Sequence, residues 1–135
     1  MASIDRSIVV AAPLAQAFDL WAHVEGWPLF LKALRDVRRI DEKKMFHFKS
    51  EREGIESEAE ISLLIPEQRV AWRTLSGVES AGVVCLESLP DGQTQVSLKM
   101  IYAPDAGWHH PDALGRRLEF HLACFKEFIE QRPDQ

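Results

Sequence analysis

The longest periodic pattern of apolar residues in this chain lies between Pro111 and Gln131. Apolar side chains recur there at every third or fourth position, which predicts one long amphipathic helix. The apolar stripe of this helix consists of Leu114, Leu118, His121, Leu122, Phe125, Phe128 and Ile129. Pro111 suits the first turn of a helix, and Asp112 beside it favours the positive end of the helix dipole. Because such a helix buries its stripe, the rest of the chain must supply an apolar surface.

The first part of the chain is expected to hold one strand and two short helical pieces. Residues 3–10 end in three β-branched residues, which is typical of a strand. A helix then begins at Pro13, because the fixed φ angle of proline suits a first helical turn. Gly26 interrupts that helix, and the apolar residues 27–31 restart it as a short turn. Two helical pieces at this place would cap one end of a sheet.

From Val37 onward the apolar period changes to two, which is the spacing of a strand with one buried face. The expected strands span residues 37–41, 45–52, 55–63, 70–74, 82–89 and 93–102. In the clearest of them the odd-numbered residues from Ile55 to Leu63 are expected to face a core. Glu56, Glu58 and Glu60 alternate with them on a solvated face. The Asp-Gly pair at residues 91–92 supplies the turn of the last hairpin.

The order of these elements predicts an α+β fold. One strand, two short helices, about six antiparallel strands and a long helix follow one another. The expected architecture is a curved antiparallel sheet of about seven strands wrapped around the C-terminal helix, with neighbours in sequence as neighbours in the sheet. The 135 residues contain no internal repeat and no interdomain linker, so residues 1–135 are expected to form a single domain.

Composition excludes several classes of function. The formal net charge is −5, and the only basic cluster is Arg35, Arg38 and Arg39, which argues against nucleic acid as a partner. No apolar segment approaches the roughly 20 residues of a membrane span, and the N-terminus does not resemble a signal peptide. Cys85 and Cys124 fit neither a metal-ligand spacing nor a disulfide framework. We therefore expect a cytoplasmic protein in which both cysteines are reduced core thiols.

The sequence predicts neither a metal site nor a cofactor. His109 and His110 are adjacent, so their side chains point in different directions, and no carboxylate pair nearby completes a ligand set. No glycine-rich phosphate loop, zinc motif or arrangement of nucleophile and base appears. The loop that holds these histidines is instead expected to form a lip at the mouth of a cavity.

Short motifs along nearly the whole chain resemble those of a known superfamily. They are Val10-Ala11-Ala12-Pro13 with Ala17-Phe18, Trp27 to Leu31, Pro66 with Val70-Ala71-Trp72, Gly82, Gly92-Gln93-Thr94, Tyr102-Ala103-Pro104, and Phe125 to Glu130. In this order they resemble the helix-grip fold of the START-like, Bet v 1-like (SRPBCC) superfamily, and within it the polyketide cyclase/dehydrase and lipid-transport family. The resemblance implies a cavity between sheet and helix. Members include lipid and sterol carriers, coenzyme Q-binding proteins, aromatase/cyclases and a ribosome-association toxin, so the fold alone does not fix a function.

His121 is the candidate residue that is most informative about function. One interpretation is a core histidine bonded to a backbone or hydroxyl partner. The other places its imidazole at the cavity wall, where it bonds a ligand oxygen or moves a proton, with Tyr102 as an oxyanion partner. The aromatic and apolar residues that point inward from the strands and the helix would line the cavity. The expected ligand-binding residues are Phe46, Phe48, Ile61, Trp72, Leu98, Met100, Tyr102, Leu118, His121 and Phe125.

Three functions remain open at this point. The first is binding of a lipid, a quinone or an aromatic, polyketide-like metabolite between helix and sheet. The second is a polyketide cyclase/dehydrase-type enzyme that uses general acid and base residues in the same cavity, with His121 as the proton carrier and Tyr102 as the oxyanion partner. The third is a protein-interaction module of the ribosome-association type. Phe120 lies off the helix stripe, where it packs under a neighbouring loop or forms the contact of a homodimer.

Overall fold

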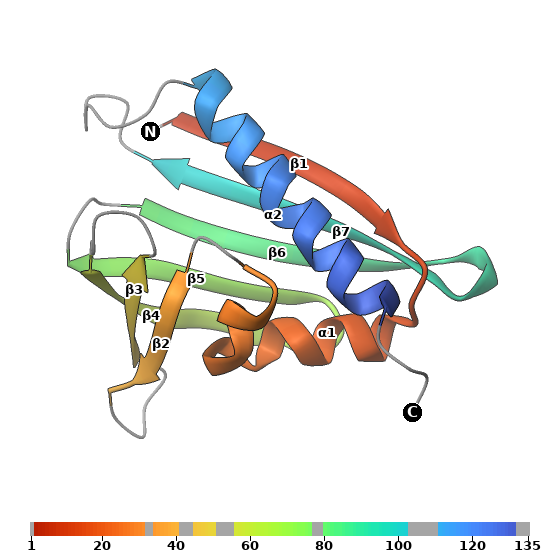
Figure 1. Cartoon of the computed structure of the whole chain (residues 1–135), viewed down its shortest axis with the longest axis horizontal. Coiled ribbons are helices and arrows are strands. Elements are labelled where there is room, and N and C mark those ends of the chain that lie inside the picture. The colour runs from red at the N-terminus through yellow and green to blue at the C-terminus, as the bar shows by residue number, and fades with distance from the viewer. Residues whose placement is uncertain are drawn as a thin grey trace.

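A computed structural model describes residues 2–31, 34–40, 45–50, 56–76, 80–102 and 111–131 (Figure 1). Seven strands, two α-helices and two short 3-10 helices follow one another. They are β1 (Ala2–Val10), α1 (Leu14–Ala22), the 3-10 helix η1 (Val24–Leu29), β2 (Leu34–Arg39), β3 (Met45–Ser50), β4 (Glu56–Ile65), β5 (Arg69–Ser76), β6 (Ser80–Leu89), the 3-10 turn η2 (Pro90–Gly92), β7 (Gln93–Tyr102) and α2 (Pro111–Gln131). The predicted α+β class and the predicted bounds of the long helix are confirmed.

The strands form one antiparallel sheet in the order β1-β7-β6-β5-β4-β3-β2. From β2 to β7 each strand pairs with its neighbour in sequence, as the short connections predict. β1 is the exception, because it pairs with β7 from Ala2 opposite Tyr102 to Val10 opposite Thr94. The hairpin between β6 and β7 turns at the predicted Asp-Gly pair, where Asp91 and Gly92 have φ angles of 66° and 73°.

α1, η1 and α2 cover the same face of the sheet. α2 lies mainly on β1 and also contacts β7, whereas α1 lies on β6 and β7, and η1 lies against β2. Figure 1 shows α2 crossing in front of β1 and β7, with α1 beside its C-terminal end. The strand direction changes progressively from β1 to β2, as expected of a twisted sheet. The sheet therefore holds α2 toward its β1 edge, with α1 beside it on β7 and β6 and η1 at the β2 edge.

An aromatic cluster joins these helices. The ring of Trp21 in α1 lies 5.0 Å from that of Phe30 and 5.1 Å from that of Phe125 in α2. Phe30 and Phe125 also contact each other at 5.1 Å, and all three side chains are almost completely buried. Phe128 extends the cluster, with its ring 5.9 Å from Phe30. This cluster fixes the C-terminal half of α2 over α1.

One strand face differs from the prediction. Leu63 was expected to face the core with Ile61, but its exposed fraction is 40% whereas that of Ile61 is 7%. The pairing of β4 with β5 shifts register between these two residues, and Leu64 packs against the core instead. A bulge of this kind adds one residue to a strand and reverses the alternation after it. On the outer face Glu60 pairs with Arg73 of β5, so the predicted acidic face is partly neutralised.

Two further predictions are corrected. β2 spans Leu34–Arg39 rather than residues 37–41. Cys85 was expected in the core, but its neighbours Val84 and Leu86 in β6 point inward and are buried, so Cys85 faces outward. The alternation of a strand requires this. Both cysteines are thiols and half-buried.

Candidate functional site

The buried side of α2 faces the sheet and the aromatic cluster. Leu118, Leu122, Phe125 and Ile129 are almost completely buried, which confirms this part of the predicted stripe. The side chain of Leu114 lies outside the described residues. Because these residues are spaced by three or four positions, they form one continuous face. Any ligand between helix and sheet would lie against this face.

The structure assigns different surroundings to the predicted site residues of the strands. Phe46, Ile61 and Leu98 are buried, whereas Trp72 and Met100 are half-buried and pack against the core. The side chains of Phe48 and Tyr102 lie outside the described residues, so the roles predicted for them remain predictions.

These residues divide into two groups. Trp72 of β5 and Met100 of β7 lie on the two strands that flank β6, and α2 contacts β7. Phe46 lies on β3, two strands beyond β5, where the guanidinium of Arg39 sits 5.0 Å above its ring. Trp72 and Met100 are therefore the described strand residues that best fit a site next to α2.

Trp72 and Met100 meet over a glycine. Gly82 of β6 is paired with Trp72 on one side and with Met100 on the other. A Cβ atom at position 82 would lie 2.6 Å from Cε2 of Trp72 and 2.9 Å from Sδ of Met100. The indole therefore rests on the bare backbone of β6, with its other side 5.0 Å from the ring of Trp27. From the sequence, Gly82 could be placed only at the start of a strand. The alternation of apolar residues does not show that the side chain of Trp72 on the neighbouring strand packs on this glycine.

His121 lies on the flank of α2 that faces the aromatic cluster. It precedes Phe125 by one turn and Phe128 by two, so the three side chains point in similar directions. Its Nε2 atom is buried and has no hydrogen-bond partner among the described residues. Burial, with a smaller contribution from the positive charge of Arg117, lowers the pKa of His121 from 6.5 to about 4. The imidazole is therefore neutral at pH 7.

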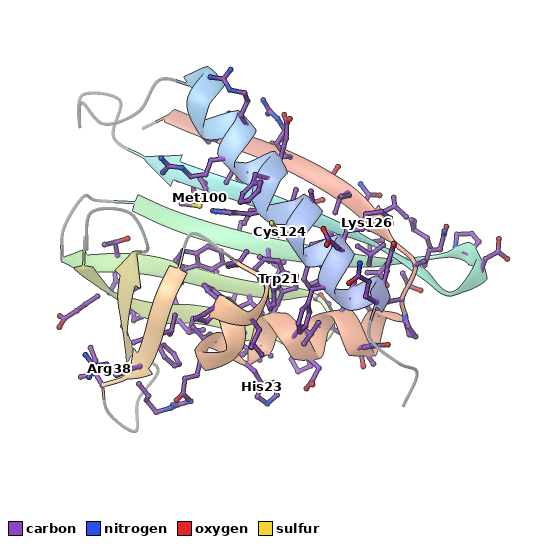
Figure 2. The ribbon with its side chains drawn as sticks, viewed as in Figure 1. Trp21, His23, Arg38, Met100, Cys124 and Lys126 are labelled. Carbon is purple, nitrogen blue, oxygen red and sulfur yellow. The ribbon has the colours of Figure 1, made fainter. Side chains whose placement is uncertain are left out.

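A second buried ring nitrogen is also without a partner. Nε1 of Trp21 has no acceptor among the described residues, although only 1% of this residue is exposed. Nε1 of Trp27, by contrast, donates to the carbonyl oxygen of Trp21 at 3.1 Å. Figure 2 shows Trp21 reaching from α1 toward α2. Nothing in the sequence distinguishes these two indoles, since both lie on the apolar face of short helices.

The two unpartnered nitrogens belong to one region of the interior. The ring of Trp21 contacts Phe125 at 5.1 Å, and His121 lies one turn before Phe125 on α2. Buried polar groups in native proteins almost always have a partner, either protein or water. Two such exceptions, one on a ring that contacts Phe125 and one a single helical turn before Phe125, are therefore positions where a polar atom of a ligand or a water molecule would be stabilised. The interpretation of His121 as a core histidine bonded through Nε2 finds no partner in the described part of the chain.

A hollow of about 300 Å³ lies elsewhere, on the outer face of the sheet. It is lined by Gln68, Arg69, Cys85, Leu86, Glu87, Gln95 and Ser97. Its side chains are mostly polar and point away from α2, so it is not the predicted apolar site.

Other predicted chemistry can be placed only in part. The described residues contain no group of three or more side chains suited to hold a metal, and the loop with His109 and His110 lies outside them. None of the helices described is both long and apolar enough to cross a membrane. Phe120 is 52% exposed, so the prediction that it packs under a loop is wrong. A homodimer contact at this residue remains a prediction.

Comparison with known proteins gives a consistent result. Residues 10–123 match the family model described as polyketide cyclase/dehydrase and lipid transport. An uncharacterised 17.2 kDa protein of Streptomyces lincolnensis is 36% identical over 141 residues, covering 98% of this chain and 92% of that protein. A crystal structure from Deinococcus radiodurans superposes with a TM-score of 0.74 and 25% identity, covering 96% of this chain and 98% of the other. The Zhui aromatase/cyclase of a Streptomyces species superposes with a TM-score of 0.71 and 21% identity, covering 97% and 94% of the two chains.

Proposed function

This chain belongs to the polyketide cyclase/dehydrase and lipid-transport family, and on that premise we propose that it binds a hydrophobic small molecule between α2 and the inner face of the sheet. The expected ligands are lipids, quinones and aromatic or polyketide-like metabolites. One observation carries the proposal: the ring nitrogens of Trp21 and His121 are both buried in apolar surroundings without a partner among the described residues.

The chemistry of these two nitrogens suits a ligand that bears oxygen. The indole N–H of Trp21 is a donor only, so it requires an acceptor such as a carbonyl or hydroxyl oxygen. Nε2 of a neutral His121 accepts from a phenol or enol hydroxyl in one tautomer and donates to a carbonyl in the other. Phe125, Trp72 and Met100 would supply apolar walls. An apolar molecule with one or two oxygens therefore fits this region better than a plain hydrocarbon.

The same features favour binding over catalysis. A general base works best when its pKa lies near the working pH. Burial lowers the pKa of His121 to about 4, which makes the imidazole a weak base at neutral pH. The cyclase alternative needs this residue to take a proton from carbon or oxygen. A neutral imidazole that only accepts or donates a hydrogen bond needs no change of charge inside an apolar region.

The test compares 1-naphthol with naphthalene, which share a ring system and differ by one hydroxyl group. Binding is measured by titration calorimetry, and native mass spectrometry of gently purified protein looks for a ligand carried from the cell. We expect 1-naphthol to bind about tenfold more tightly than naphthalene, which corresponds to one hydrogen bond of about 1.4 kcal/mol. The preference should disappear in His121→Leu or fall in Trp21→Phe, which keeps an aromatic side chain, smaller than indole, and removes the N–H.

His23→Leu is the matched control, because this histidine is exposed and distant from α2 in the chain. It should retain the wild-type preference. If neither probe binds and no species is carried from the cell, the binding function is wrong. If both probes bind equally well to the wild type, the cavity holds ligands but the ring nitrogens do not recognise them.

A further inference from the structure

β1 forms one edge of the sheet, away from the proposed ligand site, and its unpaired side is called its free edge. β1 is the first strand in the sheet order, so β7 is its only partner among the strands that the structure describes. That ladder runs from Ala2 to Val10 without a register shift. In an edge strand the backbone N–H and C=O groups of alternate residues point away from the sheet, where another strand can bind them. β1 is longer than the average strand of about five or six residues, so its free edge is extensive.

Side chains occupy several of these backbone groups. Nζ of Lys126 donates to the carbonyl oxygen of Val9 at 2.9 Å. Nη1 of Arg6 donates to the carbonyl oxygen of Asp5 at 2.7 Å. Asp5 and Val9 are four residues apart, so their carbonyl groups lie on the same edge of the strand. Since both carbonyls are bound by side chains rather than by β7, this is the free edge.

Lys126 and Glu130 act together at the end of this edge. The carboxylate of Glu130 accepts from the backbone N–H of Ala11 at 2.7 Å and from Nζ of Lys126 at 2.6 Å. Lys126 in turn donates to the carbonyl oxygen of Val9. Lys126 and Glu130, which are one helical turn apart and form an ion pair, therefore bind a backbone carbonyl and a backbone N–H at the C-terminal end of β1. Figure 2 shows Lys126 on the side of α2 next to this end of β1. We call these two residues the clasp.

We propose that the clasp closes the free edge of β1 to strand pairing with a second copy of this chain. A strand that added to β1 would need the Val9 carbonyl, which Lys126 occupies, and would meet the side chain of Glu130 beside Ala11. A second copy of the chain is the partner, because its β1 has the same regular free edge, without a bulge, and can pair with this one. Its β1 would also bury apolar side chains on both faces, since Ile4 and Ile8 lie partly exposed on the inner face and Val9 is 39% exposed on the outer face.

The experiment removes the clasp while keeping the helix. In the double variant Lys126→Met with Glu130→Gln both charges disappear, and the new residues have similar length and good helix propensity. The control is Arg116→Met with Glu127→Gln, which makes the same types of change at exposed positions of α2 away from β1. Molar mass is measured by size-exclusion chromatography with light scattering over a wide range of concentration. Wild type and control are expected to share one molar mass that does not change with concentration, and the double variant is expected to form larger species whose fraction rises with concentration.

A third substitution separates strand pairing from general loss of structure. Ser7 lies on the same edge as Asp5 and Val9, so its N–H points away from β7 and proline is tolerated there. Adding Ser7→Pro to the double variant should restore the molar mass of the wild type, because proline blocks an added strand. The single variants Lys126→Met and Glu130→Gln, which each keep one arm of the clasp, should give intermediate dimer fractions. The proposal would be overturned by a double variant that keeps the molar mass of the wild type, by a wild type that already pairs through β1, or by added association that survives Ser7→Pro.

Discussion

The guanidinium group of Arg6 lies directly on the backbone of Gly115. Arg6 points from β1 toward α2, and its Nε atom donates to Oε2 of Glu119 at 2.8 Å. A Cβ atom at position 115 would lie 3.1 Å from Cζ of Arg6 and 3.1 Å from Cδ1 of Ile4. Glycine inside a helix costs roughly 1 kcal/mol relative to alanine. At position 115 the missing Cβ atom leaves the space in which the Arg6 side chain packs between α2 and β1.

Gly115→Ala should therefore not give the stabilisation expected from helix propensity. In the wild-type background we expect the clash with Arg6 and Ile4, at about 1–3 kcal/mol, to cancel or exceed the gain of about 1 kcal/mol. With Arg6→Ala already present, most of the clash is absent and the same substitution should stabilise. Urea unfolding of the four proteins of this cycle measures the coupling. Equal effects of Gly115→Ala in both backgrounds would contradict the contact.

Gly82→Ala tests the packing of Trp72 against β6. The new methyl group would overlap the indole, which is rigid, and Sδ of Met100, which can move. We expect a loss of about 1–3 kcal/mol in the free energy of unfolding, together with a change in tryptophan fluorescence. Gly26→Ala is the control, because its nearest atom would be Cδ1 of Leu29 at 3.9 Å, an ordinary contact. The explanation fails if both variants are equally stable.

Stability should fall as the pH decreases from about 6.5 to about 4. The pKa of His121 is lowered to about 4 in the folded protein, mainly by burial. Below its unfolded value of 6.5 the unfolded chain binds a proton that the folded chain does not, so unfolding is favoured progressively. Below pH 4 both states carry the proton and this loss stops at about 3 kcal/mol. Chemical unfolding across this range measures the slope.

His121→Leu should remove this part of the slope, and His23→Gln should leave it in place. Acidic groups add a slope of their own. Hydrogen bonds from Lys126 and from the Ala11 N–H lower the pKa of Glu130, so its stabilising effect is lost as the pH falls through that depressed value. Comparison of His121→Leu with wild type cancels this contribution. An unchanged slope in His121→Leu would show that the imidazole is not buried as a neutral group.

Thr94→Val should destabilise the junction between β1 and α1. Thr94 is completely buried, and its hydroxyl donates to the carbonyl oxygen of Ala12 at 2.8 Å. Valine has nearly the same shape but cannot donate, which leaves a polar group inside without this bond at a cost of about 1–3 kcal/mol. Thr94→Ser keeps the bond and loses one methyl group, which costs about 1 kcal/mol. Thermal unfolding compares the three proteins, and a valine variant as stable as wild type would rule out a role for the hydrogen bond.

The helices and most strands could be predicted because local signals specify them. Pro111 and the three-to-four spacing of apolar residues give the bounds of α2, and alternation gives the inward faces of β5 and β7. Leu63 could not be placed correctly, since the bulge that turns it outward depends on how β4 pairs with β5. Such a register shift is a property of two strands and not of one.

The sequence predicted where the candidate site lies better than it predicted which polar groups in the site lack a partner. The position of His121 on the buried side of α2 follows from its spacing to Leu118 and Phe125. Whether its Nε2 finds a partner depends on residues far away in the chain, so two interpretations remained open. The unpartnered N–H of Trp21 was missed for the same reason, because the sequence shows an apolar helix face but not the geometry of its donors.

The pairing of β1 with β7 also determines when the sheet can be completed during synthesis. β1 must wait until Tyr102 has emerged from the ribosome, which takes several seconds at roughly 5–20 residues per second. During this time β1 has two unpaired edges and no helix to cover Ile4 and Ile8. The polar residues between them, Asp5 and Arg6, hold a charge of each sign on opposite faces of the strand. A nascent chain with these two residues replaced by apolar ones should aggregate before its last helix is made, even where the finished fold would tolerate the change.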